Sequence, residues 1–162
     1  MPGRNETTTL VAIAATIVVV DQWTKAAIVS ALGPMAFSSR LELGAEWLAL
    51  EYAENRGAAF GVFPDLTQGL ILVSVAIVMG LMVHYARDAG PPAWRTVGIA
   101  AIAGGAIGNL LDRIRLGYVV DFISVGDWPN FNVADSAITV GALLVVWGWL
   151  QANGDSARPE LG

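Results

Sequence analysis

The chain has 162 residues, of which 55% are hydrophobic and only 14% charged, a balance typical of a membrane protein and too apolar for a soluble domain. The formal net charge of −5, with only nine Lys and Arg residues, excludes a nucleic-acid-binding face. The lack of cysteine excludes disulfides, thiolate nucleophiles and cysteine metal sites.

Four apolar segments predict four membrane-spanning helices, because ~20 apolar residues are needed to cross a bilayer. We expect these helices at about residues 9–32, 66–86, 93–113 and 134–152. The first includes Asp21 and Lys25, and the third ends on Asp112 and Arg113. Because isolated charges in lipid are costly, these side chains should lie near a helix end or face the protein interior.

The first apolar run is also compatible with a cleavable signal peptide that ends at Val29-Ser30-Ala31. A retained helix fits better, because Asp21 to Lys25 interrupts the apolar region and Glu6 offsets Arg4.

Two segments outside the helices complete a single integral-membrane domain over residues 1–162. Residues 33–65 form an extramembrane segment in which Trp47 to Tyr52 favours a short strand, and residues 114–133 form a loop. The fold class is therefore a mainly α membrane protein, with four transmembrane helices and a small extramembrane β-sheet and loop region on one face.

The polar residues of the spans should meet at one membrane face. The first and third helices run in the same direction, and the fourth begins where the third ends, so these ends coincide. The residues brought together are Asp21, Lys25, Asn55, Asn109, Asp112, Arg113, Asn132 and Asp135.

Elimination narrows the chemistry of this polar site. The sole histidine, His84, lies near the opposite end of the second helix, which excludes a Ser-His-Asp triad and a histidine-rich metal site. No nucleophile elbow or phosphate-binding glycine loop is present, so we expect no metal and no cofactor. Carboxylates remain, and two aspartates that share a proton can hydrolyse a peptide bond with water.

Five short motifs carry a resemblance to a known family. They are Asp21-Gln22-Trp23-Thr24-Lys25, Glu54-Asn55-Arg56-Gly57-Ala58-Ala59-Phe60, Gly108-Asn109-Leu110-Leu111-Asp112-Arg113, Val119-Val120-Asp121-Phe122 and Phe131-Asn132-Val133-Ala134-Asp135. In this order, on four spans, the motifs resemble those of lipoprotein signal peptidase, the signal peptidase II family, from about residue 10 to 150. Each motif alone is weak, but the ordered set is specific.

The resemblance implies an aspartyl endopeptidase whose catalytic pair is Asp121 and Asp135. The supporting and substrate-contacting residues that it implies are Asp21, Lys25, Asn55, Gly57, Asn109, Asp112, Arg113 and Asn132. It implies cleavage of a prolipoprotein just before its lipid-modified cysteine, at the outer face of the bacterial inner membrane. The expected partners are this substrate and membrane lipids, and the expected state is a monomer.

The chain departs from the family pattern in one loop, and its charges do not set its orientation. The connection over residues 122–134 is short for the family, which leaves the size of any flanking lid open. The positive-inside rule does not orient the chain, because basic residues are divided between the two faces, so the orientation comes from the family.

The residues alone leave simpler interpretations open. Asp135 is typical of the N-cap of the fourth helix, and Asp121 of a solvated loop. Asp21 and Lys25, four residues apart, predict an ion pair within a helix, and Lys25 is also a candidate partner for Asp112. Asn55 is typical of a turn, and Arg113 is a candidate to orient the substrate backbone.

Two other functions compete with the aspartyl peptidase. One is a serine peptidase in which Lys25 is the general base and the nucleophile is Ser30, Ser38, Ser39, Ser124 or Ser136. The other is a small ion-conducting membrane protein whose buried charges line a path.

Overall fold

A computed structural model confirms the mainly α fold with a small sheet, and it describes residues 1–34, 36, 40–57 and 67–156. The helices are α1 (Arg4–Leu32), α2 (Thr67–Ala86), α3 (Ala93–Leu116) and α4 (Val133–Ser156). All four are long and apolar enough to cross a membrane. The strands are β1 (Arg40–Ala45), β2 (Leu48–Asn55), β3 (Val119–Val125) and β4 (Trp128–Phe131).

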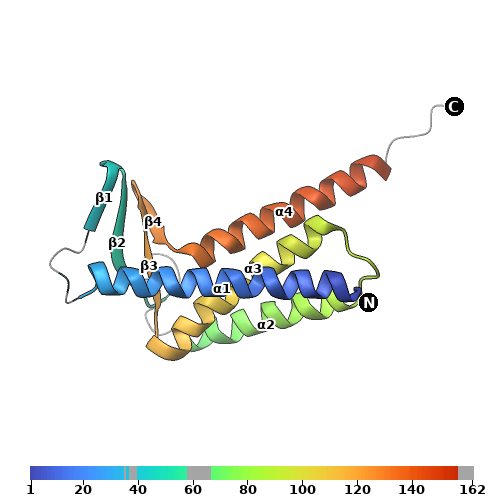
Figure 1. Cartoon of the computed structure of the whole chain (residues 1–162), viewed down its shortest axis with the longest axis horizontal. Coiled ribbons are helices and arrows are strands. Elements are labelled where there is room, and N and C mark those ends of the chain that lie inside the picture. Colours follow the sequence, from blue (N-terminus) through green and yellow to red (C-terminus); the bar gives the residue numbers. More distant parts are fainter. Residues whose placement is uncertain (35, 37–39, 58–66, 157–162) are drawn as a thin grey trace.

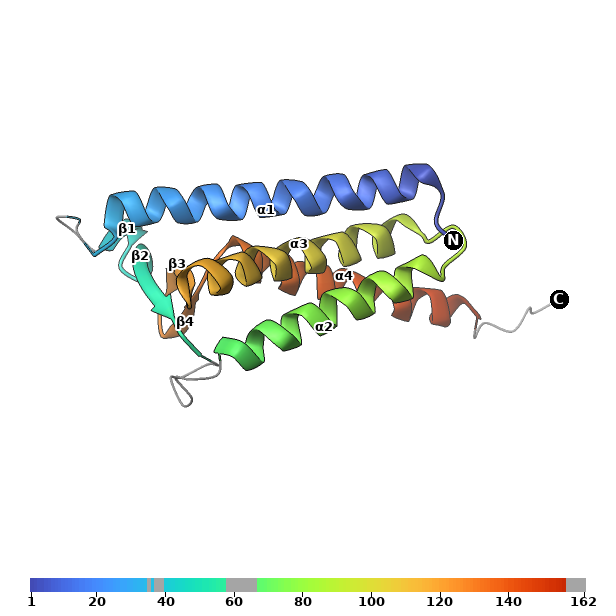
Figure 2. The ribbon, with the colours of Figure 1, turned by 90° about the horizontal axis from the view of Figure 1, so that it is seen from below.

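Helix α3 is the centre of the bundle and packs against α1, α2 and α4 (Figure 2). Its small residues allow this close packing, because a side chain at Gly104 would lie 2.8 Å from the carbonyl oxygen of Ala14 in α1. A side chain at Gly105 would meet the carbonyl oxygen of Ala134 in α4. The glycines of α3 therefore set how near α1 and α4 can come.

The four strands form one antiparallel sheet in the order β1-β2-β3-β4. The sheet lies at one end of the helices, and the N-terminus and the end of α4 lie at the other (Figures 1 and 2). The β3–β4 hairpin occupies residues 119–131, where the sequence predicts a loop. Gly126, with a φ of 54°, supplies its tight turn.

Three helices extend beyond their predicted ends, and α4 does so by continuing to Ser156 instead of about residue 152. Helix α1 begins at Arg4 instead of about residue 9, and its first polar residues are satisfied internally: the hydroxyl groups of Thr7 and Thr8 donate to carbonyl oxygens four residues earlier. Helix α3 continues to Leu116 and stops at Gly117, whose φ of 80° is the left-handed conformation that ends helices.

A bulge in β2 changes the face on which its last residues lie. Leu50 pairs with Ile123 and Ala53 pairs with Asp121, so β2 uses three steps where β3 uses two. Because side chains alternate along a strand, this extra residue places Asn55 on the same face as Asp121. Without the bulge, Glu54 would occupy that face.

Candidate active site

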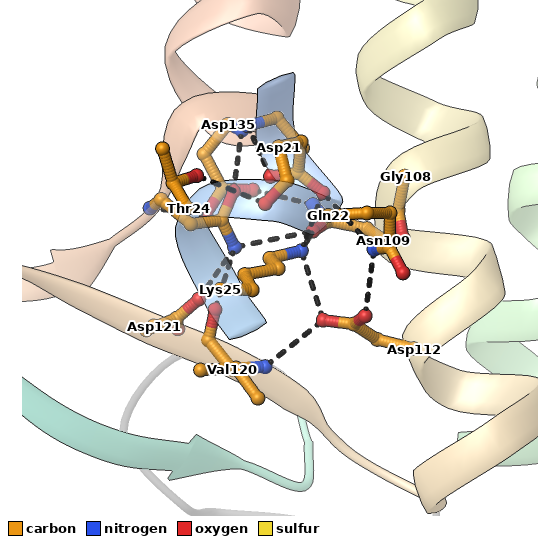
Figure 3. Close-up of polar contacts among 12 residues, drawn as sticks. Asp21, Gln22, Thr24, Lys25, Gly108, Asn109, Asp112, Val120, Asp121 and Asp135 are labelled. Atoms are coloured by element: carbon orange, nitrogen blue, oxygen red, sulfur yellow. Dashed lines mark hydrogen bonds and ion pairs between the residues drawn. The ribbon is translucent and has the colours of Figure 1, made fainter. Parts of the chain in front are cut away.

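Lys25 of α1 lies at the centre of a buried charge cluster (Figure 3). Its ammonium Nζ is 2.9 Å from Asp21 Oδ2, 2.9 Å from Asp112 Oδ2 and 3.0 Å from Asn109 Oδ1. Asp21, Lys25 and Asp112 are at most 3% exposed. Since an ammonium group has three donors, these three acceptors use all of them.

The two carboxylates of this cluster each hold a segment that carries one of the predicted catalytic aspartates. Asp112 Oδ2 accepts a hydrogen bond from the backbone N–H of Val120, 3.2 Å away, which fixes β3 just before Asp121. Asp21 Oδ1 accepts from the backbone N–H of Ala134, 2.9 Å away, which fixes α4 just before Asp135. The expected α1 ion pair and the Lys25–Asp112 contact are thus both present, and they position the polar end of the fold.

Asn132, and not Asp135, is the N-cap of α4. Asn132 Oδ1 accepts from the backbone N–H of Asp135 at 2.9 Å, and Asp135 Oδ2 accepts from the backbone N–H of Asn132 at 3.2 Å. This reciprocal pair is a capping box, with Asp135 in the third helical position. The interpretation of Asp135 as the cap was therefore wrong by three residues.

The Asp121 carboxylate is buried on β3 and accepts two hydrogen bonds from side-chain amides. Asn132 Nδ2 donates to Oδ1 at 2.7 Å, and Asn55 Nδ2 donates to Oδ2 at 2.9 Å. Asp121 is 2% exposed, and this burial raises the pKa of its carboxyl group to about 6. The two hydrogen bonds oppose this rise in the pKa, whereas the negative charge of Asp135 adds to it. Asp121 is therefore a strand carboxylate, and the interpretation as a solvated loop residue was wrong.

Asn109 links the charge cluster to Asp135. Its Nδ2 donates to Asp135 Oδ1 at 2.7 Å, while its Oδ1 accepts from Lys25 and, at 3.1 Å, from Asn132 Nδ2. Because Lys25 can only donate, the amide of Asn109 has only one orientation that satisfies all its partners. The lysine thereby fixes which atom of Asn109 faces Asp135.

Both predicted catalytic carboxylates contact Asn132, so they converge on one residue. Each of their four oxygen atoms accepts one hydrogen bond, from Asn55, Asn109 or the side chain and backbone of Asn132. A carboxylate oxygen has a second lone pair, so the four oxygens can still bind a water molecule or a substrate amide. The arrangement suits acid–base chemistry between two oriented carboxyl groups.

Arg113 and Gly57 do not bind the carboxylates of this pair directly. Among the described residues, the half-buried guanidinium of Arg113 has no hydrogen-bond or ion-pair partner, yet it interacts electrostatically with Asp135 and Asp121. The backbone N–H of Gly57 donates to Asn55 Oδ1 at 3.3 Å, which orients the Asn55 amide towards Asp121. Asn55 is thus both the turn residue and a site residue.

Gln22 is a member of the network that the sequence motifs alone did not single out. Its Nε2 donates to Asp112 Oδ1 at 2.9 Å, and its Oε1 accepts from Arg115 at 3.1 Å. Its position inside the motif Asp21-Gln22-Trp23-Thr24-Lys25 was the available signal.

The described residues contain no group of three or more His, Cys, Asp or Glu side chains that could hold a metal ion. Of the serines considered as nucleophiles, Ser38 and Ser39 lie outside the described residues. Ser136 Oγ donates to the carbonyl oxygen of Asn132, and the polar partners of Lys25 Nζ among the described residues are Asp21, Asp112 and Asn109, none of them a serine that could give it a proton. The geometry therefore favours carboxylate chemistry over a Ser-Lys pair.

Comparisons with known proteins agree with this description. A family model described as Signal peptidase (SPase) II matches residues 13–151. The chain is 38% identical to a lipoprotein signal peptidase of Pelotomaculum thermopropionicum over 148 residues, which cover 91% of this chain and 95% of the relative. It is 37% identical to that of Halothermothrix orenii over 136 residues, which cover 83% and 91%.

Solved structures share the fold. A bacterial membrane enzyme determined by the in meso method at 2.3 Å resolution superposes with a TM-score of 0.82 at 29% identity, over 96% of this chain and 95% of the other. A second such enzyme, at 1.9 Å resolution, gives a TM-score of 0.78 at 32% identity, over 88% and 93%.

Proposed function

Since this chain belongs to the signal peptidase II family and is therefore a membrane peptidase of prolipoproteins, we propose that Asp121 and Asp135 are its catalytic pair. The reaction is hydrolysis of the peptide bond just before the diacylglyceryl-modified cysteine. The observation that carries the proposal is the convergence of both carboxylates on Asn132 in a poorly solvated place.

The chemistry follows from two carboxyl groups that hold one proton between them. The ionised carboxylate takes a proton from a water molecule, whose oxygen attacks the scissile carbonyl carbon while the protonated partner donates to the carbonyl oxygen. The resulting tetrahedral diol collapses, the C–N bond breaks, and the amine of the modified cysteine leaves with a proton. The pair ends with one proton, as it began.

Neighbouring groups supply the substrate contacts. Arg113 and Asn55 flank the pair and hold the carbonyl groups of the substrate backbone, which must unwind locally to present an amide. A cavity of about 320 Å³ beside Asp135 is lined by Trp128, Phe131, Thr139 and Val140, together with Ser136, and accepts an apolar part of the substrate. The diacylglyceryl chains remain in the lipid.

The protein lies in the bacterial inner membrane as a monomer, and the sheet and the aspartate pair face the outer side, where exported precursors arrive. The signal helix approaches sideways through the bilayer and packs against the helices of the enzyme. The exposed aliphatic residues of α2 and α4 support a lipid-facing surface there; examples are Leu72, Ile77, Val140 and Leu143.

The test is a matched pair of isosteric substitutions. We expect Asp121→Asn and Asp135→Asn to lower the cleavage of a synthetic diacylglyceryl-cysteine precursor by about 10³-fold, because each removes one partner in proton transfer. Mass spectrometry of the products gives the rate and the bond that is cut.

Asp127→Asn is the control, because Asp127 is an exposed residue in the turn between β3 and β4. It should cleave at the wild-type rate, and circular dichroism should show that all three variants are folded. Turnover near the wild-type rate in either folded site variant would refute the aspartate pair.

A further inference from the structure

A second cavity lies at the end of the bundle opposite the aspartate pair. Its volume is about 370 Å³, within the range of about 300–1,000 Å³ that is typical of small-molecule sites. Helix α3 contributes Ile99 and Ile102 to the lining, α2 contributes Leu81, and α4 contributes Val145 and Val146. The cavity is thus an aliphatic groove formed by three membrane-spanning helices.

The polar residues of this groove gather at its outer rim, at the ends of the helices. His84 lies near the end of α2, Trp94 and Arg95 lie in the first turn of α3, and Trp149 lies in the last part of α4. His84 and Trp149 are exposed. Tryptophans near the ends of membrane-spanning helices are typical of the membrane–water interface. The groove therefore runs from the interface into the hydrocarbon layer.

Arg95 is held in a fixed position at the rim. Its Nη1 is 2.7 Å from Asp88 Oδ2, and its guanidinium carbon is 5.2 Å from the ring centre of Trp94. The Trp94 ring in turn lies against Gly148 of α4, where any side chain would collide with it. The salt bridge uses one of the five N–H donors of the guanidinium, so the group is oriented in advance and can still bind an anion.

We propose that this groove binds one anionic phospholipid of the leaflet opposite the aspartate pair, with an acyl chain among the aliphatic residues and the phosphate at Arg95. Charge decides between occupants. The segment from His84 to Arg95 contains two arginines and one aspartate, a net charge of +1 with His84 neutral, which attracts an anionic headgroup. The basic amino terminus of a signal peptide would be repelled there.

The site is independent of the proposed peptidase chemistry, since none of its residues belongs to the network around Lys25. Its occupant would fill the space between α2 and α4, which both pack against α3, and so support these helices at this end. We therefore expect the lipid to stabilise the protein without taking part in cleavage.

The experiment measures lipid retention by native mass spectrometry. Delipidated protein in detergent is titrated with phosphatidylglycerol or phosphatidylcholine, and one tightly bound phosphatidylglycerol is expected. Arg95→Gln should weaken its binding on the order of tenfold, because a charge-assisted contact is lost, and Val146→Trp should weaken it by filling the groove. Arg4→Gln is the matched control, because Arg4 is an exposed cation at the same end that does not line the cavity.

Two further arms separate the possible outcomes. Glycerol phosphate at the same concentration should not displace the lipid, because it lacks the acyl chain that fills the groove. Cleavage rates of Arg95→Gln and Val146→Trp should equal the wild-type rate, so this proposal and the aspartate pair can fail separately.

Equal retention of both lipids, or equal loss in Arg4→Gln and Arg95→Gln, would overturn the proposal. So would a raised KM for the precursor in Val146→Trp with unchanged lipid retention, because it would show that the signal helix occupies the groove.

Discussion

Around Lys25, α1, α3, α4 and β3 meet through buried charges and amides, whereas around Ile99 the same bundle meets through aliphatic packing. At the apolar end, the core consists of Leu10, Tyr85, Ile99 and Ala100, and Tyr85 and Thr96 share a hydrogen bond of 3.2 Å. At the polar end, every buried side-chain nitrogen and oxygen atom among the described residues has a partner.

This contrast determines how each end tolerates change. Aliphatic contacts have no direction, so the apolar end depends on volume and can adjust to small losses. Hydrogen bonds have direction, and a buried polar atom that loses its partner retains its full cost of desolvation. We therefore expect substitutions at the polar end to be several times more costly than conservative ones at the apolar end.

The largest effect is expected for Lys25→Met. The substitution leaves Asp21 and Asp112 buried without their cation, which should lower the free energy of unfolding by about 3–5 kcal/mol. Denaturant titration in detergent micelles, followed by circular dichroism, measures this loss.

The triple variant Asp21→Asn, Lys25→Met, Asp112→Asn provides the control, because it removes the charges together. It should recover part of the stability that the single variant loses. If Lys25→Met lowered the free energy of unfolding by under about 1 kcal/mol, the loss would be no larger than that of an ion pair on the surface. The cluster would then not hold this end of the protein together.

A smaller effect is expected from pH through Asp121. Its folded pKa of about 6 lies above the unfolded value of about 3.9, so the folded state keeps its proton longer. Below about pH 4, Asp121 is protonated in both the folded and the unfolded state, so its burial does not lower the free energy of unfolding. As the pH rises to about 6, the unfolded state loses its proton first, and the free energy of unfolding should fall by about 3 kcal/mol at most.

Asp121→Asn removes this contribution together with its coupling to Asp135, while the carboxyl groups outside the pair titrate alike in both proteins. The stability difference between wild type and variant, measured by denaturation between pH 4 and pH 7, should shift against the wild type as the pH rises. A constant difference would show that Asp121 is no harder to ionise in the folded protein.

The smallest effect is expected for Tyr85→Phe at the apolar end. The ring stays packed and only the hydrogen bond with Thr96 is lost, so the free energy of unfolding should fall by about 1 kcal/mol. The same denaturation assay applies, and peptidase activity should not change. A loss as large as that of Lys25→Met would remove the contrast between the two ends.

The sequence predicted the parts of this molecule that depend on the hydrophobicity of its segments and on the alternating direction of its helices. Four apolar runs were enough for four helices, and the alternation of their directions predicted that Asp21, Asn109 and Asp135 lie at one end. The Lys25–Asp112 contact also followed, since a buried cation between two spans needs an anion.

Other features depend on contacts between distant residues and could not be predicted. The β3–β4 hairpin has local signals, namely the β-branched run from Val119 to Val125 and the turn at Gly126-Asp127, but its place in the sheet is set by the pairing of β3 with β2, whose residues lie far away in the chain. The cap at Asn132 is equally ambiguous, because Asn132 and Asp135 are both good N-cap residues and only the bonds to Asp121 and Asn109 decide their roles.

The bulge in β2 limits which changes of length the chain can accept. One further residue inserted between Ala53 and Glu54 would undo the effect of the bulge, because it would reverse the alternation of the residues that follow and turn the Glu54 carboxylate towards Asp121 in place of the Asn55 amide. A third negative charge would then face the aspartate pair, and a donor would be lost. Insertions in the β1–β2 turn leave this relation intact, so natural variation in loop length is easier to accommodate before Leu48 than after it.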